Sequence, residues 1–311
     1  MVLLLYVSIV DKSFMMAAPL AHNIILLILA LQINLLRGRK IILSKVITVT
    51  NPRGRKITFS EDEHKYHDEK GKLYRSTTHI IHSLFPEFPK DMMAYLTARK
   101  RIMKEEGYEN KEDVPKWQCM QLKQKVLKEW DENRDSACDL GTEVHRYAEC
   151  KLEEIPFDME WSAERQTKMG KVLDKFIPQM LEQYEYVESE KIIFCPKIRL
   201  AGTVDLIMRN RKNGKPCIFD WKTNKEIRQK DSYGKTGLLF LEHLPNCNYF
   251  QYALQLSVYK KILHDEGYGD FSDCELGLFH INTRKVQGYQ LPSMDWEVEE
   301  IWKYTKNLKE S

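Results

Sequence analysis

Three consecutive strand-like runs between residues 191 and 222 constrain the fold of this chain most tightly. The runs are rich in β-branched and other apolar residues, and only short turn sequences separate them, at Pro196-Lys197 and Asn213-Gly214. Turns of this kind join neighbouring antiparallel strands. The sequence therefore predicts an antiparallel meander with strands at Lys191–Cys195, Leu200–Met208 and Pro216–Lys222.

The third run ends with an acid and a lysine on either side of a tryptophan. Side chains alternate along a strand, so we expect Asp220 and Lys222 to share one face and Trp221 to face the opposite layer. Pairing in the meander would bring Asp205 of the second run close to Asp220. Two adjacent carboxylates favour a divalent cation, and a lysine beside them can orient or deprotonate water. Taken singly, these residues are also typical of exposed positions on amphipathic strands.

Helical and strand-like patterns alternate along the rest of the chain. The hydroxyl groups of Ser76, Thr77 and Thr78 suit the start of the helix that follows them, and Pro178 lies inside another predicted helix. The order of elements predicts an α/β fold with a mixed sheet flanked by helices. Further strands are predicted at Val46–Thr50, Lys56–Ser60, His64–Tyr66, Leu276–Ile281 and Val286–Leu291, and helices at His79–Leu84, Asp91–Glu132 (interrupted near Gly107 and Pro115), Asp139–Glu153, Ser162–Tyr184, Asn248–Glu266 and Met294–Leu308.

The composition indicates an ordered protein in a reducing environment. With 43% hydrophobic and 30% charged residues, the 311-residue chain can form a sizeable core. Its net charge of +3 gives no global basic signal, so a nucleic acid would have to bind local basic patches. The seven cysteines are dispersed without a C-x-x-C pair, which predicts free thiols, an intracellular location and no zinc knuckle.

Residues 1–45 are predicted to be an apolar appendage to the fold. Ile24–Leu36 is strongly apolar, and the wider stretch Met15–Leu36 is nearly long enough to span a bilayer at the usual ~20 residues. The basic residues that follow it lie on the wrong side for a secretory signal. A targeting or anchoring segment and a translation start further downstream are the open alternatives. Polar residues that are unusual in a single-pass anchor occur at His22, Asn23, Gln32 and Asn34.

Two helical patterns add polar side chains to the candidate site. His145 and Glu149 lie four residues apart, which places them on one face of a helix. Gln251, Gln255 and Tyr259 form a stripe with the same spacing on a later helix. A histidine and a carboxylate can share a metal ion, and amide groups can bind phosphates or base edges. Each pattern alone is also typical of an ordinary helix surface.

The motifs occur in an order that resembles one family of nucleases. The sequence resembles the PD-(D/E)xK nuclease superfamily, and within it the RecB-like exonuclease branch, over roughly residues 139–260, which is less than half of the chain. The segment Tyr74–Thr78 is also similar to a motif that precedes the core of mitochondrial genome maintenance exonuclease and of some viral and phage exonucleases. The four matching motifs are Gly141-x-x-x-His145 followed by Glu149, Gly202-x-x-Asp205, Asp220-x-Lys222 and Gln255-x-x-x-Tyr259.

The resemblance implies a role for each matching residue. Asp205 and Asp220 would bind the metal, the backbone carbonyl of Trp221 would complete its site, and Lys222 would be the catalytic lysine. The second acid is Asp rather than the more frequent Glu, a departure that the family tolerates. Two further metal-site residues are implied on the preceding helix, His145 and Glu149. The predicted substrate-binding residues are Gln251, Gln255, Tyr259, Lys225 and Thr78. Gln255 and Tyr259 would either contact the substrate strand or brace the site.

The function implied by the resemblance is Mg²⁺- or Mn²⁺-dependent hydrolysis of phosphodiester bonds in DNA. We expect an exonuclease that acts on single strands or free ends in replication, repair or recombination. The cysteines that hold an iron–sulfur cluster in some relatives are missing, so none is expected. The chain has no helicase P-loop, so unwinding would come from a partner helicase, and a single-strand-binding protein is a second expected partner.

The predicted organisation is an appendage at 1–45 and a single restriction-endonuclease-like nuclease domain at 46–311. Residues 46–135 would supply a helical N-terminal region that walls the DNA channel, where Trp117 or Trp130 could stack on bases, and 136–311 would form the core. The alternatives are a structure-specific endonuclease of the same fold, a catalytically silent nucleic-acid-binding module, and a membrane-anchored protein with an incidental nuclease-like core.

Overall fold

The computed structural model describes residues 46–60, 63, 65–157 and 166–310. The chain divides into two compact units, and the second, which comprises 47–59 and 63–311, contains all of the described residues except Val46 and Ser60. The predicted appendage and the start of the helix predicted from Ser162 lie outside the described residues. None of the described helices combines the length and the apolar character needed to cross a membrane.

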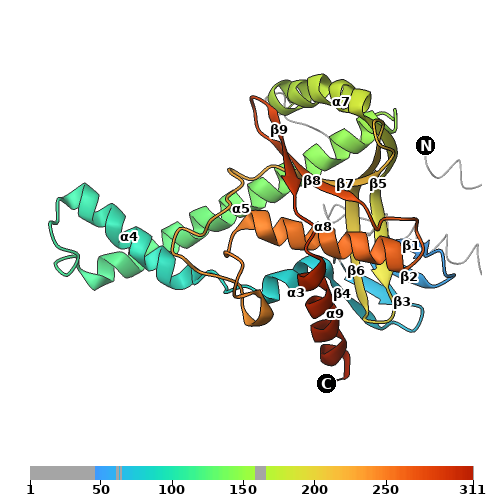
Figure 1. Cartoon of the computed structure of the whole chain (residues 1–311). Coiled ribbons are helices and arrows are strands. Elements are labelled where there is room, and N and C mark those ends of the chain that lie inside the picture. Colours follow the sequence, from blue (N-terminus) through green and yellow to red (C-terminus); the bar gives the residue numbers. More distant parts are fainter. Residues whose placement is uncertain (1–45, 61–62, 64, 158–165, 311) are drawn as a thin grey trace, which may run out of the picture. The chain divides into compact units, whose positions relative to one another are not determined.

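A mixed sheet of nine strands forms the centre of the fold (Figure 1). Its order is β1-β2-β3-β4-β6-β7-β8-β9, with β5 paired to β6. The neighbours β5–β6, β6–β7 and β8–β9 are antiparallel, whereas β4–β6 and β7–β8 are parallel. The predicted α/β fold and the antiparallel meander are therefore confirmed. The strands are β1 (Val46–Thr50), β2 (Lys56–Ser60), β3 (Lys65–Asp68), β4 (Leu73–Ser76), β5 (Tyr184–Cys195), β6 (Leu200–Asn210), β7 (Pro216–Lys222), β8 (Glu275–Ile281) and β9 (Val286–Leu291).

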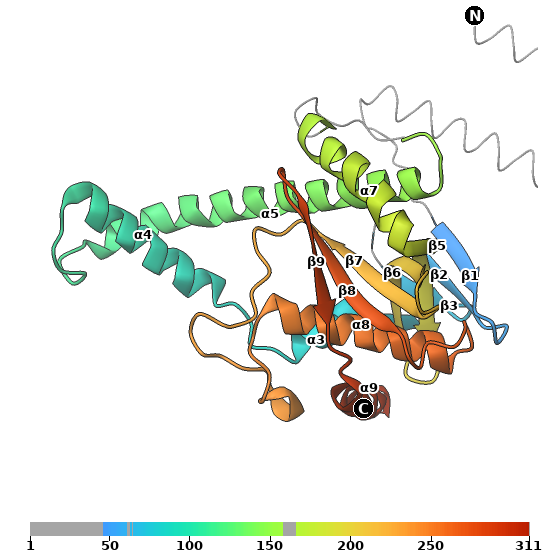
Figure 2. The same ribbon diagram turned by 45° about the horizontal axis from the view of Figure 1, so that its top comes forward.

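Helices cover both faces of the sheet. On one face, α3 (Thr77–Ser83), α8 (Asn248–Asp265) and α9 (Asp295–Glu310) enclose a large apolar core with the strands. On the other face, α7 (Lys171–Gln183) and the C-terminal part of α5 (Lys116–Leu152) enclose a second core. Figure 2 shows α5 and α7 above strands β7–β9 and α8 and α9 below them. The remaining described helices are α4 (Lys90–Glu106), the π-helix η1 (Gln166–Gly170) and the 3-10 helix η2 (Leu239–Leu241).

The long helix α5 differs from the prediction. It is continuous over 37 residues, whereas the sequence predicted a break between Glu132 and Asp139. Gly141, expected near a helix start, lies inside α5, where a Cβ atom would lie 3.7 Å from the hydroxyl of Thr223. Exposed polar residues between the two halves of α5 weaken the apolar period, which explains the wrong break. The N-terminal half packs against α4, and both project from the sheet (Figures 1 and 2).

The segment before the meander also differs from the prediction. The helix predicted to reach Tyr184 is split into η1 and α7, and Pro178 lies inside α7 without ending it. Strand β5 begins directly at Tyr184, seven residues before the predicted start at Lys191. In the added part, exposed and half-buried side chains alternate over residues 184–187, residues 188–190 are all half-buried, and the apolar run that marks a buried strand is missing.

Strand β6 exchanges one neighbour for another along one of its edges. Strand β5 pairs with β6 from Leu200 to Asn210. The other edge pairs with β4 at Leu200 and Ala201 and with β7 from Leu206 to Arg209. Strand β7 then continues beyond Phe219 in contact with β8. The edge of β6 is therefore open around Asp205, between the end of β4 and the departing end of β7.

Candidate active site

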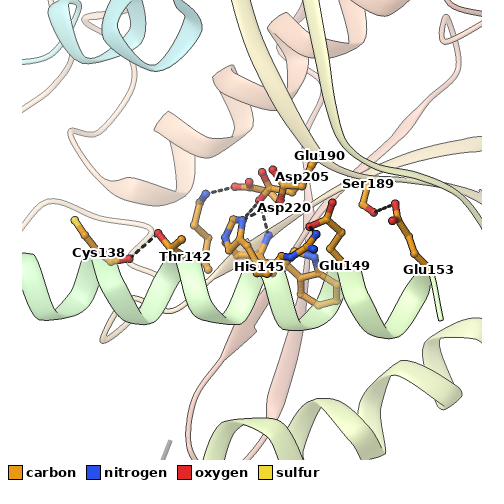
Figure 3. Close-up of polar contacts among 12 residues, drawn as sticks. Cys138, Thr142, His145, Glu149, Glu153, Ser189, Glu190, Asp205 and Asp220 are labelled. Atoms are coloured by element: carbon orange, nitrogen blue, oxygen red, sulfur yellow. Dashed lines mark hydrogen bonds and ion pairs between the residues drawn. The ribbon is translucent and has the colours of Figure 1, made fainter. Parts of the chain in front are cut away.

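Side chains from three elements meet around Asp205 of β6. His145 of α5, Glu190 of β5 and Asp205 of β6 each place one ligand atom within 4.8 Å of the others, and Figure 3 shows them gathered over α5. His145 Nδ1 lies 3.4 Å from a carboxylate oxygen of Glu190 and 3.4 Å from one of Asp205. Two hard oxygen ligands and one imidazole nitrogen suit a divalent cation such as Mg²⁺ or Mn²⁺.

The sequence predicted His145 and Asp205 at this site but missed Glu190. The φ angle of Glu190 is +48°, which is uncommon for a residue other than glycine and typical of strained functional positions. Strand pairing joins Ser189 to Leu206 and Lys191 to Val204, so Glu190 lies opposite Asp205. Counting back across the hairpin turn, from Cys195 opposite Leu200, would have located this acid in the sequence.

Asp220 and Lys222 lie on one face of β7, as the alternation of the strand predicts. The ammonium of Lys222 forms an ion pair with Asp220, while Trp221 is buried in the opposite core beneath α5 and α7. The Trp221 N–H donates to a carboxylate oxygen of Asp205 at 3.1 Å, where a hydrogen bond of the β-ladder would otherwise lie. Because Trp221 lies between Asp220 and Lys222 in sequence, this bond holds Asp205 beside the pair.

Burial and repulsion make Asp220 difficult to ionise. Its side chain is only 3% exposed. Burial and then the charge of Asp205 raise the pKa of Asp220 to about 8, against the attraction of Lys222. Burial alone would lower the pKa of Lys222, but the charges of Asp220 and Asp205 outweigh burial and raise it. A divalent cation next to these carboxylates would relieve the repulsion between them.

The backbone of β7 fixes the orientation of the His145 ring. The Trp221 carbonyl oxygen accepts a hydrogen bond from His145 Nε2 at 3.0 Å, so Nε2 carries a proton. In the neutral ring, the lone pair is then on Nδ1 and faces Glu190 and Asp205, as a metal ligand requires. Burial disfavours the protonated ring, but Asp205 and Glu190 outweigh burial and raise the pKa of His145 to about 9. The residues fit a divalent cation, and the Trp221 carbonyl as a ligand stays a prediction.

The second residue predicted on α5, Glu149, is engaged elsewhere. Its carboxylate accepts a 2.6 Å hydrogen bond from Arg146 in an ion pair one turn along the helix. In the described part of the chain, the group of potential ligands at this site consists of His145, Glu190 and Asp205 without Glu149. The predicted contact of Glu149 with the metal therefore has no support in the geometry, and Glu190 supplies the carboxylate instead.

A cavity of about 460 Å³ opens beside the cluster. It lies between α3, α5, α8 and the end of β7, and His145 and Lys222 line it. Three of the predicted substrate-binding residues also line the cavity, namely Thr78, Gln251 and Gln255. The Gln255 amide donates to the Thr78 hydroxyl at 3.1 Å, so α3 and α8 are joined at the cavity wall.

The other two predicted substrate-binding residues lie in different surroundings. Lys225 is exposed just beyond the cavity-lining residues Thr223 and Asn224. Tyr259 is 3% exposed, and its hydroxyl accepts a 2.9 Å hydrogen bond from Gln255. Its ring occupies the space where a Cβ atom on Gly202 would be, at 2.5 Å. The buried ring braces β6 against α8, which is one of the two roles expected for it, and a contact of Tyr259 with substrate stays a prediction.

An aromatic ring that the sequence analysis did not single out lies against the lysine. The Lys222 ammonium is 4.8 Å from the centre of the Tyr252 ring on α8, within the range of a cation–π interaction. The Tyr252 hydroxyl accepts a 2.5 Å hydrogen bond from the Asn224 amide. His280 Nε2 on β8 donates to the Asn224 carbonyl oxygen at 2.6 Å. These contacts fix the chain just after Lys222 and restrict where its ammonium can lie.

Comparisons with known proteins agree with this site. A family model described as the PD-(D/E)XK nuclease superfamily matches residues 79–308. No curated protein matches the chain. A solved structure described as "Putative exonuclease" from Eubacterium rectale is 13% identical, with a TM-score of 0.34, and the match covers 55% of this chain and 64% of that chain. The protein SSO0001 is 19% identical, with a TM-score of 0.24, over 54% of this chain and 74% of that chain.

The family match carries the assignment, since neither structural likeness is close enough to support an argument. The matched region includes all four motifs, and the structure brings His145, Asp205, Asp220 and Lys222 together at the central strands β6 and β7. Proteins of this family are nucleases that hydrolyse phosphodiester bonds with divalent metals. With a family model that matches well over half of its 311 residues, this chain belongs to the PD-(D/E)XK nuclease superfamily and has its restriction-endonuclease-like fold.

Proposed function

We propose that this protein is a Mg²⁺- or Mn²⁺-dependent exonuclease of the RecB-like branch that removes nucleotides from DNA ends, in replication, repair or recombination. The observation that carries the proposal is the set of ligand atoms from His145, Glu190 and Asp205 within 4.8 Å, directly beside the Asp220–Lys222 ion pair and a substrate-sized cavity.

The residues divide the work of hydrolysis between them. His145, Glu190, Asp205 and Asp220 would hold the cation, which when bound neutralises phosphate charge and makes a water more acidic. Lys222 faces the cavity and would stabilise the charge that develops on the phosphate oxygens. The hydroxyl of Thr78 and the amide of Gln255 lie at the wall where the neighbouring phosphate would pass.

The position of the cavity supports an enzyme that acts on a single strand. Helix α5 borders the cavity on one side and α3 and α8 border it on the other, so the reacting phosphate would lie between helices rather than on an open surface. A strand can reach such a site by its free end, as an exonuclease requires. We expect a helicase or a single-strand-binding protein to supply that strand, in a reducing intracellular compartment in which the seven free thiols stay reduced.

The test compares end-labelled linear single-stranded DNA with the same sequence closed into a circle. We expect Mg²⁺-dependent loss of the linear strand and no loss of the circle, with EDTA abolishing the reaction. Cleavage of the circle at a comparable rate would instead identify an endonuclease of the same fold. Binding without cleavage in Mg²⁺ or Mn²⁺ would identify a silent binding module and refute the proposal.

A native thiol offers a second, independent test of where the strand binds. Cys138 is exposed and lines the cavity, whereas the other six free cysteines are buried. A maleimide reagent should therefore label Cys138 first in the folded protein. Bound single-stranded DNA is expected to slow this labelling, and labelling at an unchanged rate with saturating DNA would place the strand outside the cavity.

A further inference from the structure

The loop between β7 and α8 leaves the active site directly. Thr223 and Asn224 line the cavity at its beginning, and Gln251 lines the cavity just after its end. Its base is fixed to the start of α8, because the Asn248 side chain donates to the Glu226 carbonyl at 2.8 Å and accepts from the Arg228 N–H at 2.8 Å. In Figures 1 and 2 the loop extends beyond the N-terminal end of α8, on the side from which α4 projects.

The tip of this loop is a preorganised turn. The Asp231 carboxylate accepts hydrogen bonds from the N–H groups of Tyr233 at 2.7 Å and Lys235 at 2.9 Å, and Gly234 adopts a φ of +68°. The Asn246 N–H donates to the Lys235 carbonyl at 2.8 Å and closes the loop. The backbone of the tip is therefore held in one conformation without help from the Tyr233 ring.

That conformation presents an aromatic ring to solvent. Tyr233 is 73% exposed, compared with 68% for Trp117 at the far end of α5 and 56% for Trp296 on α9. Exposure of a large ring costs hydrophobic free energy, and a turn needs no tyrosine at this position. A ring held out by a fixed backbone can stack on an unpaired base with little loss of conformational entropy.

The charges around the ring favour a polyanion. The loop carries Lys225, Lys230 and Lys235, and no carboxylate in the described part of the chain lies within ion-pair distance of any of them. Arg228 is 3.6 Å from Glu226, and Asp231 is occupied by the backbone of the turn. The third acid of the loop, Glu242, is exposed and follows η2, seven residues after Lys235. Lysines around an exposed ring can bind phosphates while the base stacks.

We propose that the β7–α8 loop is a nucleotide-binding subsite outside the catalytic centre, in which Tyr233 stacks on an unpaired base and Lys230 and Lys235 bind the flanking phosphates. The subsite rests on the proposed function, because it would hold the strand that passes from the cavity between α5 and α8. Its ligand is single-stranded nucleic acid, since a base inside a duplex has no free face for the ring.

The test is a thermodynamic cycle between the ring and a base. Tyr233 and Tyr233→Ala are compared in a Lys222→Ala background, with fluorescent single-stranded oligodeoxynucleotides that each carry one abasic position. We expect Tyr233→Ala to weaken binding of the intact strand by about 5- to 150-fold. For the protein with Tyr233, loss of the base at one position of the strand should weaken binding by the same factor. The oligonucleotide that lacks this base should bind equally to the proteins with and without the Tyr233 ring.

Control variants separate stacking from general effects. Tyr233→Phe keeps the ring and should bind like the protein with Tyr233. Lys230→Gln with Lys235→Gln should reduce the slope of log affinity against log salt by about 1.4, at about 0.7 for each lost phosphate contact.

Two results would overturn the subsite. The first is that the protein with Tyr233→Ala binds the intact strand as tightly as the protein with Tyr233. The second is that, for every abasic position, the factors by which Tyr233→Ala and the missing base weaken binding multiply, because the ring and the base then act independently. Wild-type cleavage is measured in parallel. If the wild type cleaves DNA while the cycle shows no coupling, the subsite alone fails. If the wild type neither binds nor cleaves DNA, the subsite and the proposed function fail together.

Discussion

Asp220→Asn should make the cation-free protein less sensitive to alkaline pH. The folded wild type holds Asp220 protonated up to a pKa of about 8, because burial and the charge of Asp205 oppose its ionisation. In the unfolded chain this carboxyl has its ordinary pKa of about 3.8. Between these values the folded state binds one proton more than the unfolded state, so wild-type stability falls as pH rises. The isosteric amide does not titrate and removes this loss.

The magnitude follows from a single proton. One proton of difference changes the free energy of unfolding by about 1.4 kcal/mol per pH unit. From about pH 5.5 to about pH 7.5, the stability of Asp220→Asn relative to the wild type should therefore rise by about 3 kcal/mol. Loss of the contact between the Asp220 carboxyl and Lys222 shifts the absolute stability of the variant by an amount that does not follow this slope. The trend with pH is therefore the quantity to compare.

Urea unfolding in EDTA over this pH range measures the difference. Asp295→Asn is a matched control, because the hydrogen bond from Ser293 lowers the pKa of Asp295 and its contribution is constant above about pH 5. Saturating Mg²⁺ should remove most of the wild-type slope, since a bound cation favours the ionised form of Asp220. The expected titration of Asp220 would be refuted if the difference in free energy of unfolding between Asp220→Asn and the wild type did not change with pH over this range.

Five further variants test single contacts in and around the site. His145→Ala should reduce cleavage without abolishing it. Glu190→Gln should raise the Mg²⁺ concentration that gives half-maximal cleavage. Both effects are measured with end-labelled DNA across a Mg²⁺ titration. Tyr252→Leu should lower kcat with little change in KM, while Tyr252→Phe retains the ring beneath Lys222 and most of kcat. Gly202→Ala should destabilise the fold by about 1–3 kcal/mol in urea unfolding, because the new methyl group would meet the Tyr259 ring.

Local periodicity was enough to predict the elements that carry the catalytic motifs. Strand β7 has the predicted bounds Pro216–Lys222, and helix α3 is capped by the hydroxyl of Ser76 as expected. Alternation along β7 gave the common face of Asp220 and Lys222, because a strand has a fixed period of two residues. These features depend on neighbours in sequence, which is why they could be predicted without the fold.

Features that depend on contacts between distant segments were missed. Glu190 reaches the metal site only because its backbone departs from strand geometry opposite Asp205. Spacing alone did not decide whether Tyr259 contacts substrate or braces the site, because its burial depends on Gly202 of β6, which lies far away in sequence. The continuity of α5 through Glu132–Asp139 is equally invisible in sequence, because this exposed segment is held by packing at both ends of the helix.

The central claim is that Lys222, beside the carboxylates of a metal site, makes this protein a nuclease. The most direct test measures Mg²⁺-dependent cleavage of end-labelled linear single-stranded DNA by the wild type, Lys222→Ala and Lys215→Ala. Lys215 precedes the opposite end of β7 and pairs with Asp273 at the surface, so it controls for loss of a lysine from the same region. We expect cleavage by the wild type and Lys215→Ala, and none by Lys222→Ala despite retained DNA binding. Cleavage by Lys222→Ala at the wild-type rate would contradict the account.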